Sequence, residues 1–350
     1  MLEALPITIH GYQFLEEIGK GGFSNVYLVY SSTYNQQFVA KVQKTEYERN
    51  SKQIRAFTAE VDALASLNHP NIIKLYDHFF ENQYYIMILE YCPFGTLNDL
   101  MKEEKNKSGM NSENFKWFSR QIIEALNEVH KSNMSHHDIK PHNILIDGYG
   151  RPKLADFGLC LQNCKNDVLT SSFSGSLSFM APEILQHQPF DPQKADMWSL
   201  GVMFMYMLTG ELPFKIITSQ EQLKRNIMNC SYDIHKILPR KINSIIRRLM
   251  MPDPNRRFTC EELLNLPFYE KITQNDQSRS FNSSISSLKM STSCVATGLF
   301  RSCSNFNALK PNENFDQVSK IKTLSNYSLN KLTRQKTMAP RFHRKLNTFQ

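Results

Sequence analysis

The sequence SHHDIKPHN occupies residues 135–143, and KLADFG follows at residues 153–158, fifteen residues after Asp138. A carboxylate close to a lysine and an asparagine can orient a hydroxyl group, neutralise a transferred phosphoryl group and bind a metal ion. A second carboxylate in a tight glycine turn would add the main metal ligand. A connecting loop without a function would have no reason to combine these residue types at this spacing. The two segments therefore predict a catalytic site.

The residues before these segments alternate as strands. Val, Tyr and Phe recur between turn residues in YQFLEEIG (12–19), NVYLVYSS (25–32) and QQFVAKVQ (36–43), which is typical of an antiparallel meander. A helix is predicted at residues 52–67, where apolar residues recur at helical spacing before Pro70. Two further strands are predicted at residues 72–80 and 84–92.

The residues after Gly95 favour helices. One is predicted from Phe115 to Lys131, short strands at residues 144–146 and 153–155, and more helices between Ala195 and Tyr269. The nearly uncharged segment from Met197 to Gly210 is shorter than the ~20 residues that span a bilayer, so we expect a buried helix and no transmembrane segment. The pattern predicts an α+β protein with a small β-rich part before a larger helical part.

The charge of the chain is unevenly distributed. The 350 residues carry a formal charge of +8, but residues 275–350 hold twelve basic and three acidic residues and account for +9. The first 274 residues therefore come to −1. From residue 273 the composition shifts to Ser, Asn, Lys and Thr with isolated apolar residues, so we expect a disordered basic tail.

The basic residues of the tail alternate with apolar ones between Lys331 and Phe349. This pattern is compatible with an anionic membrane, nucleic acid or calmodulin as partner. Pro340 would interrupt a continuous amphipathic helix, which weighs against calmodulin. A solvated extension without a partner is the favoured reading.

Seven cysteines are scattered along the chain, and the only close pair, Cys160 and Cys164, is not accompanied by a second pair at metal-ligand spacing. This pattern indicates reduced thiols in an intracellular protein. Residues 1–10 lack the cationic start and apolar run of a secretory signal. We therefore expect a cytoplasmic protein, with the nucleus as an alternative.

Two further features carry little information alone. Residues 19–26, GKGGFSNV, lie between two predicted strands, where glycines would let backbone amides approach phosphate oxygens. On its own, such a segment favours a simple glycine-rich hairpin turn. Lys41, in the third strand, could pair with Glu60 on the following helix, although a strand lysine is usually only solvated.

Taken together, the segments resemble eukaryotic protein kinases. The catalytic-loop and metal-loop sequences HHDIKPHN and DFG are followed in order by APE (181–183), DMWSLG (196–201) and DPNRR (253–257). Lys140 and the pair Gly175-Ser176 look like the serine/threonine type, and HPNIIKLYDHF and YGRPKLADFGL are most similar to the calmodulin-dependent and AMP-activated kinase group. The resemblance runs over about residues 12–269.

The resemblance implies a two-lobed fold with ATP and Mg²⁺ as ligands. It places an N-terminal extension at residues 1–11, a small lobe at 12–89, a hinge at 90–95, a helical lobe at 96–272 and the tail at 273–350. The implied ATP-binding residues lie in the glycine loop, on the sheet, at the hinge and in the helical lobe: Gly19, Lys20, Gly21, Gly22, Phe23, Ser24, Val26, Val39, Lys41, Glu60, Leu89, Glu90, Cys92 and Leu145.

Individual roles follow from the same resemblance. Lys41, paired with Glu60, would contact the α- and β-phosphates. Val26, Val39 and Leu145 would enclose adenine, Leu89 would be the gatekeeper, and Glu90 and Cys92 would offer hinge backbone groups. Asp138 would accept the substrate hydroxyl proton, Lys140 would steady the γ-phosphate, and Asn143 and Asp156 would hold two Mg²⁺ ions. Glu183 and Arg257 would form a buried ion pair, and Asp196 would anchor the catalytic loop.

Two departures from the family pattern alter the expected regulation and specificity. His137 replaces the arginine that pairs with a phosphorylated activation loop, and with a reference pKa of ~6.5 a histidine is mostly neutral at pH 7. We expect activity to depend little on phosphorylation at the activation-loop hydroxyls, Thr170, Ser171, Ser172 and Ser174. An equally weighted alternative is that these hydroxyls only make the loop polar.

The second departure concerns substrate specificity. The positions that contact an arginine upstream of the target residue in related kinases correspond to Thr96, His142 and Tyr206. None of them is acidic, which argues against a strong arginine preference.

The sequence therefore predicts a monomeric serine/threonine protein kinase that uses ATP with Mg²⁺ and acts on proteins in intracellular signalling. The alternative is a pseudokinase that binds ATP or partners as a scaffold, for which His137 would be a sign of decay. The residues expected to touch ATP, metal and substrate hydroxyl are all present, which favours the enzyme. A regulatory or anionic partner of the tail would be accessory.

Overall fold

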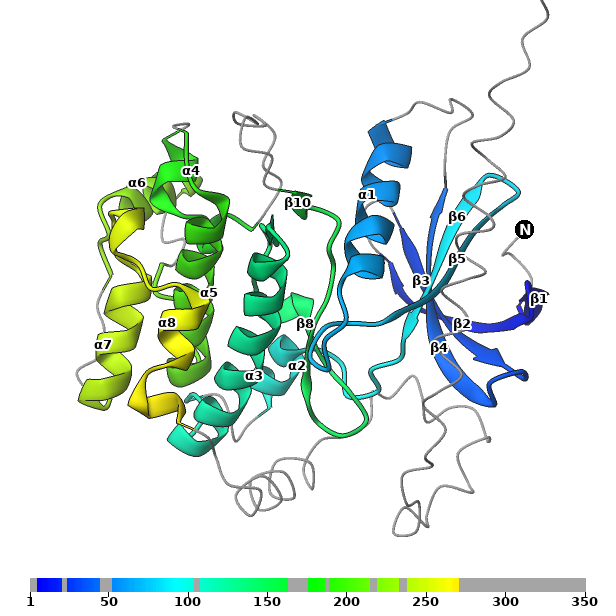
Figure 1. Cartoon of the computed structure of the whole chain (residues 1–350), viewed down its shortest axis with the longest axis horizontal. Helices are drawn as coiled ribbons and strands as arrows, with labels where there is room; N and C mark the ends of the chain where they lie inside the picture. The colour runs from blue at the N-terminus through cyan, green and yellow to red at the C-terminus, as the bar shows by residue number, and fades with distance from the viewer. Residues whose placement is uncertain are drawn as a thin grey trace, which may run out of the picture. The chain divides into compact units, whose positions relative to one another are not determined.

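The computed structural model describes residues 5–20, 24–44, 52–103, 108–162, 176–186, 189–214, 219–232 and 238–270. These residues all fall within one compact unit, residues 1–296. The predicted tail, the activation-loop hydroxyls and residues 21–23 of the glycine loop lie outside them. In this part of the chain a β-rich lobe precedes a mainly helical lobe, as the sequence predicts (Figure 1).

The small lobe is a six-stranded antiparallel sheet with one helix beside it (Figure 1). The strand order is β1-β2-β3-β4-β6-β5. The bounds are β1 Ile7–Ile9, β2 Tyr12–Lys20, β3 Asn25–Ser31, β4 Gln36–Lys44, β5 Leu75–Glu81 and β6 Tyr84–Glu90, with helix α1 at Lys52–Ser66. The predicted N-terminal extension contributes β1, which pairs with β2 and buries Ile9 in the core of the sheet.

Alternation along β4 assigns its side chains to two faces of the sheet. Phe38, Ala40 and Val42 are buried in an apolar core on one face, while Val39 and Lys41 are half-buried on the other. Because successive strand residues point to opposite faces, one strand supplies both the packing of the lobe and a functional lysine.

The strand predicted at residues 72–80 begins later, at Leu75. Ile72 forms a parallel bridge with Leu154, and the Ile73 amide donates to the Leu154 carbonyl at 2.9 Å. These backbone groups therefore bond to the other lobe instead of the sheet. The same segment ties the two lobes together just before the turn that carries Asp156.

The large lobe is mostly helical, with short strands next to the HHDIKPHN and DFG segments. Its helices are α2 Leu97–Lys102, α3 Ser112–Lys131, α4 Pro182–Leu185, α5 Pro192–Thr209, α6 Gln220–Met228, α7 Arg240–Leu249 and α8 Cys260–Leu264. Its strands are β7 Met134–Ser135, β8 Ile144–Ile146, β9 Pro152–Leu154 and β10 Leu161–Gln162, paired as β8 with β9 and β10 with β7. A 3-10 turn at Pro141–Asn143 leads into β8.

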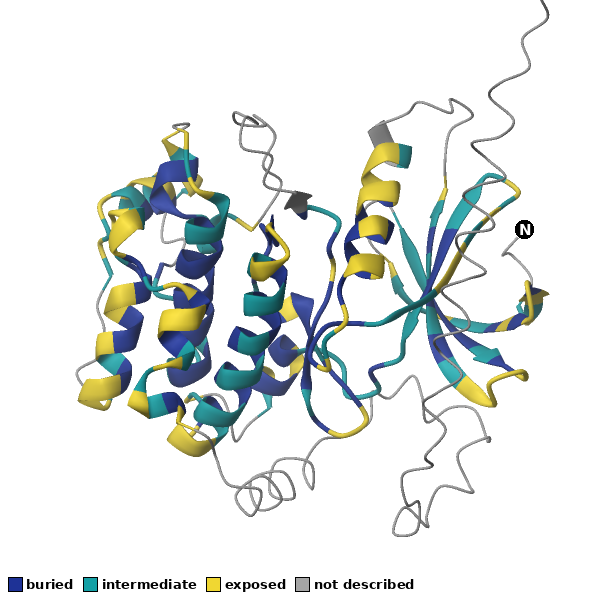
Figure 2. Ribbon diagram, viewed as in Figure 1, coloured by how far each residue is buried: buried dark blue, intermediate teal, exposed yellow. Residues whose placement is uncertain are grey.

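Helix α5 forms part of the core of the large lobe, and most of its residues are buried (Figure 2). The absence of a side chain at Gly201 lets it approach α7, because an added Cβ would lie 2.7 Å from Met250 Cγ and 2.8 Å from Leu249 Cβ. The predicted buried helix is thus confirmed. Among the described residues, no helix combines the length and apolar character needed to cross a membrane.

The predicted ion pair between Glu183 and Arg257 is present and buried. Two guanidinium nitrogens of Arg257 contact the two carboxylate oxygens of Glu183 at 2.6 and 2.8 Å. Further N–H groups of Arg257 donate to the carbonyls of Met251 and Lys194, each at 2.8 Å. These contacts satisfy the buried charges, so the pair joins α4 to the segment before α8.

Candidate active site

Lys41 joins three elements at the meeting point of the two lobes. Its Nζ donates to Glu60 Oε1 of α1 at 2.7 Å and to Asp156 Oδ1, in the turn after β9, at 3.1 Å. The predicted pairing of Lys41 with Glu60 is therefore confirmed, and Asp156 shares the same ammonium group.

The charges of Lys41 and Asp156 stabilise each other, whereas burial raises the pKa of Glu60. Burial works against the charged form of Lys41, but the carboxylates of Glu60 and Asp156 raise its pKa above the ordinary value. Burial would raise the pKa of Asp156, yet Lys41 holds it below the ordinary value. Lys41 therefore stays cationic and Asp156 anionic at neutral pH, which suits contacts with a phosphate and a metal ion.

A second cluster surrounds the Asp138 carboxylate. Lys140 Nζ donates to Asp138 Oδ2 at 2.7 Å, and Asn143 Nδ2 donates to the same oxygen at 2.8 Å. Asn143 Nδ2 also reaches the Asp138 carbonyl at 2.8 Å. Asp138, Lys140 and Asn143 of the HHDIKPHN segment are therefore in direct contact. They belong to a loop and a 3-10 turn that fix their relative positions.

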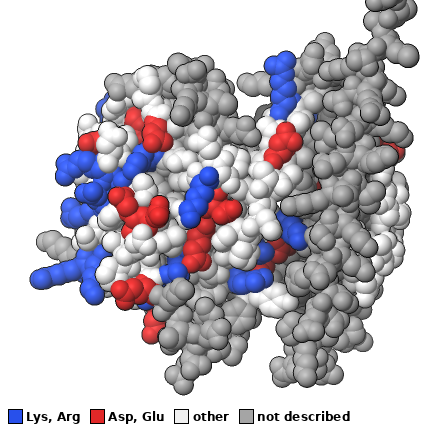
Figure 3. Space-filling model, in the orientation of Figure 1, with Lys and Arg blue, Asp and Glu red and all other residues white. Residues whose placement is uncertain are grey.

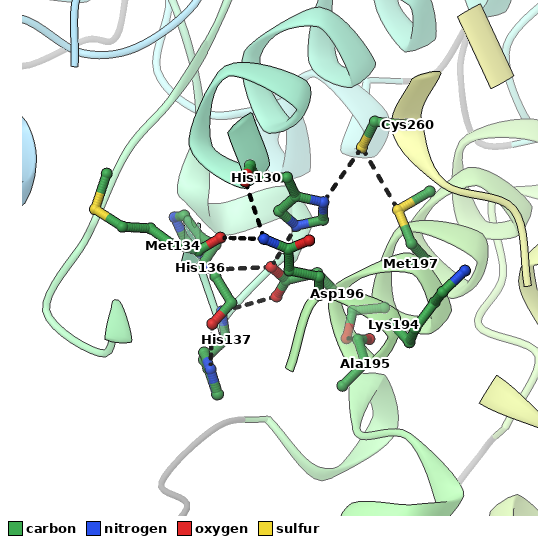
Figure 4. A network of polar contacts seen from close by, with 12 residues as sticks. His130, Met134, His136, His137, Lys194, Ala195, Asp196, Met197 and Cys260 are labelled. Carbon is green, nitrogen blue, oxygen red and sulfur yellow. Dashed lines mark hydrogen bonds and ion pairs between the residues drawn. The ribbon is translucent and has the colours of Figure 1, made fainter. Parts of the chain in front are cut away.

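The loop carrying Asp138 is fixed from beneath by Asp196 of α5 (Figure 4). The Asp196 carboxylate accepts the amides of His136 and His137, each at 2.8 Å, and lies 3.0 Å from His130 Nε2. Burial would raise the pKa of Asp196, but the histidines around it, His130 above all, hold it below its ordinary value. The predicted anchoring role of Asp196 is confirmed.

His137 fits this loop through local contacts. Its backbone has a positive φ of 67°, and its ring nitrogen Nε2 lies 2.7 Å from Ser135 Oγ. Burial lowers the pKa of His137, so the ring is neutral at pH 7. A neutral ring bonded to a serine hydroxyl is a poor partner for a phosphate group, in keeping with the sequence-based expectation.

The residues predicted to enclose adenine belong to both lobes. Val39 is the register partner of Leu89, and Val26 is the partner of Lys41, so all four lie on the same face of the sheet. In the helical lobe, Leu145 forms a backbone bridge with Thr96, just after the hinge. Cys92 is buried at the hinge.

The described part of the glycine loop closes a hairpin. Gly19 pairs with Val26, and Lys20 pairs with Asn25. The intervening Ser24 is half-buried, and Gly21, Gly22 and Phe23 lie outside the described residues. The strand, loop and strand order is therefore the one that the sequence predicts.

The chemistry of Asn143 and Asp156 suits Mg²⁺, which prefers oxygen ligands. The Asn143 amide nitrogen is committed to Asp138, which leaves its amide oxygen to bind a cation. Asp156 has half of its side chain exposed and a positive φ of 64°. A backbone bond from the Ala155 amide to the Asn143 carbonyl, 2.9 Å long, connects the two segments.

Lys153 is a site-supporting residue that the sequence analysis missed. Its buried Nζ lies 2.7 and 2.9 Å from the two carboxylate oxygens of Glu90, so the hinge is tied to the strand that leads into Asp156. Residues 63 positions apart make this contact. No local sequence pattern could have shown it, because β9 alone gives no indication of its neighbour across the lobes.

Asp99 is a second missed residue. Thr96 Oγ1 donates to Asp99 Oδ2 at 2.7 Å. Burial raises the pKa of Tyr206, with a further rise from Asp99. Burial lowers the pKa of His142, which Asp99 opposes. Thr96, one of the three positions predicted to read an upstream arginine, is therefore bonded to an exposed carboxylate whose charge also acts on His142 and Tyr206. The capping pattern of Thr96 and Asp99 could have indicated this carboxylate.

Comparison with known proteins identifies the family. Residues 12–269, well over half of the chain, match the family model described as "Protein kinase domain". Maternal embryonic leucine zipper kinase of Xenopus laevis is 32% identical over 258 residues, covering 73% of this chain and 39% of the relative. NUAK family SNF1-like kinase 2 of Rattus norvegicus is 31% identical over 254 residues, with shares of 73% and 39%.

A third relative is named for the type of kinase. Serine/threonine-protein kinase PKH2 of Saccharomyces cerevisiae is 28% identical over 282 residues, covering 77% of this chain and 26% of the relative. The chain thus spans well under half the length of these three relatives. The chain belongs to the protein kinase family, and the predicted serine/threonine type, similar to the calmodulin-dependent and AMP-activated kinases, is confirmed.

Proposed function

We propose that the chain is an active serine/threonine protein kinase, which transfers the γ-phosphoryl group of ATP to serine or threonine hydroxyls of proteins in intracellular signalling. The observation that carries this proposal is the contact of one ammonium group with two carboxylates: Lys41 Nζ lies 2.7 Å from Glu60 and 3.1 Å from Asp156. This contact needs the sheet, α1 and the turn after β9 in one arrangement, which is the arrangement that phosphoryl transfer requires.

The binding roles follow from charge and position. Lys41 would hold phosphate oxygens, and Asn143 and Asp156 would hold Mg²⁺ through oxygen atoms. The half-buried face with Val26, Val39 and Leu89 would pack against adenine, with Leu145 on the other side. Mg²⁺ bound there would neutralise phosphate charge.

We assign the catalytic roles to Asp138 and Lys140. Asp138 would accept the proton of the substrate hydroxyl, since its carboxylate accepts a hydrogen bond from Asn143 and its backbone amide donates to the His136 ring. Lys140, 2.7 Å from that carboxylate, would place a positive charge where the transferred phosphoryl group gains negative charge. Rate acceleration would come mainly from alignment and charge neutralisation.

The alternative is a pseudokinase that binds ATP or partners without transfer. One observation favours it: His137, where the family has an arginine, is neutral and bonded to Ser135. Its backbone amide nevertheless holds the loop through Asp196 at 2.8 Å. The substitution leaves the placement of Asp138 intact, and this supports the active enzyme.

Phosphotransfer from radiolabelled Mg-ATP separates the two functions. The full chain should phosphorylate serine and threonine in a degenerate peptide library. Asp156→Asn should lower the rate at least about a hundredfold, because it removes a metal-binding charge. The matched control Asp62→Asn changes an exposed carboxylate on α1 and should leave the rate unchanged.

Thermal shift with Mg-ATP completes the test. Stabilisation of the wild-type chain by Mg-ATP without any phosphopeptide would establish the pseudokinase and contradict our proposal.

We further propose that the protein acts as a monomer in the cytoplasm, with the nucleus as an alternative, and that any partner of the basic tail regulates or locates it.

A further inference from the structure

The sulfur of Cys260 lies at the end of a chain of polar contacts beneath the catalytic loop (Figure 4). Cys260 is the first residue of α8, and 2% of it is exposed. Its Sγ lies 3.7 Å from His130 Nδ1, and the opposite ring nitrogen, Nε2, lies 3.0 Å from Asp196 Oδ2. His130 therefore stands between a thiol and a carboxylate.

The hydrogens of this cluster have a consistent assignment. The Cys260 thiol can donate its own hydrogen to Met197 Sδ, 3.5 Å away, which leaves the sulfur lone pairs toward His130. Burial works to lower the pKa of His130, but the hydrogen bonds of its ring to Asp196 and Cys260 and the charge of Asp196 raise it. With both ring nitrogens protonated, Nδ1–H donates to the sulfur and Nε2–H donates to the carboxylate.

The far end of the cluster is the catalytic loop itself. The oxygen of Asp196 that contacts His130 also accepts the His136 amide at 2.8 Å, and the other oxygen accepts the His137 amide at 2.8 Å. Asp138 is the next residue along the chain. A change in the orientation of Asp196 would therefore move the loop by way of its two anchored amides.

We propose that Cys260 is a positioning residue for the catalytic loop, acting through His130 on Asp196. A ring held at Nε2 alone could rotate about that contact, whereas one held at both nitrogens has a fixed plane and a fixed proton on Nε2. Serine could replace the thiol as acceptor, and alanine could not. The kinetic part of this inference rests on the proposed kinase function; the hydrogen-bonding part does not.

Selective ¹⁵N-histidine labelling of the full chain tests the contact directly. One sample reports the ring nitrogens of His130 and the backbone amides of His136 and His137, with His130 assigned by the loss of its signals in His130→Gln. In Cys260→Ala we expect the Nδ1 proton of His130 to be lost or to exchange rapidly, and amide exchange at His136 and His137 to rise about three- to tenfold. Cys260→Ser should retain the wild-type pattern.

Kinetics provide the second readout. Cys260→Ala should lower kcat about three- to tenfold while the KM for ATP stays within about twofold, because the nucleotide contacts are not touched. The control Leu263→Val thins the packing of the same helix without altering a polar contact, and should leave the His130 signals as in the wild type.

Unchanged His130 ring signals in Cys260→Ala would overturn the proposal, as would an equal rise of amide exchange in Leu263→Val. Wild-type ring and amide signals in Cys260→Ser, together with the loss in Cys260→Ala, would support it. If the wild-type chain transfers no phosphate, the proposed function fails, but the ring and amide signals still decide the role of Cys260.

Discussion

Arg257 carries a charge into the interior, with none of its side chain exposed beside Glu183. Arg257→Ala would leave the Glu183 carboxylate buried without its partner, which typically costs about 3–5 kcal/mol. We expect the free energy of unfolding, measured by urea titration, to fall by that amount. The neighbouring Arg256→Ala, at an exposed position, should change it by less than about 0.5 kcal/mol. A loss below about 1 kcal/mol in Arg257→Ala would show that the pair contributes little.

Asp99 is a second single residue for which we expect a measurable effect, in this case on substrate choice. It is exposed and bonded to Thr96, so a cationic substrate side chain could reach its carboxylate. We expect Asp99→Asn to lower kcat/KM for peptides with arginine three residues upstream by about two- to fivefold relative to alanine peptides, the range of an exposed ion pair. Asp62→Asn serves as the control. Equal arginine selection by Asp99→Asn and wild type would remove Asp99 from substrate reading.

At the scale of the element, the catalytic loop hydrogen-bonds to structure that needs no phosphate group. The Asp196 carboxylate accepts hydrogen bonds from two backbone amides of this loop, and the Ser135 hydroxyl is hydrogen-bonded to the His137 ring. We therefore expect phosphatase treatment of the purified protein to change kcat by less than about twofold, since neutral His137 offers a phosphate no charge. Mass spectrometry should confirm that phosphate has been removed. A tenfold loss of activity would mean that phosphorylation controls the enzyme without a cation at position 137.

Elements differ in how well the sequence predicts them, and distance along the chain is the reason. Asp138, Lys140 and Asn143 lie within six residues, so their meeting could be read from spacing alone. The β4 strand was equally clear, because its alternation is local. The contacts of Lys153 with Glu90 and of Cys260 with His130 join residues 63 and 130 positions apart. These contacts depend on how elements pack, which residue spacing does not encode.

At the scale of the whole molecule, net charge distinguishes the kinase domain from the tail. Basic and acidic side chains are interspersed on the face of the described residues that Figure 3 shows. The first 274 residues come to −1, and residues 275–350 carry +9. Attraction to anionic surfaces should therefore belong to the tail.

Removal of residues 274–350 tests this division. We expect any binding of the full chain to vesicles of phosphatidylcholine with 30% phosphatidylserine to weaken with salt and to disappear in the shortened chain, because the basic excess is gone. The melting temperature should shift by less than about 2 °C, since a polar segment buries little apolar surface. Undiminished vesicle binding by the shortened chain would place the anionic contact on the kinase domain.

The buried thiol of Cys92 has a consequence for chemical probes of this protein. Burial, with a further contribution from Glu90, raises the pKa of Cys92 far above that of a free thiol. Cysteine-directed electrophiles react with thiolate, which is scarce at such a site. A hinge-binding inhibitor that carries an acrylamide would therefore gain little from bond formation at Cys92, and its selectivity would have to come from reversible contacts.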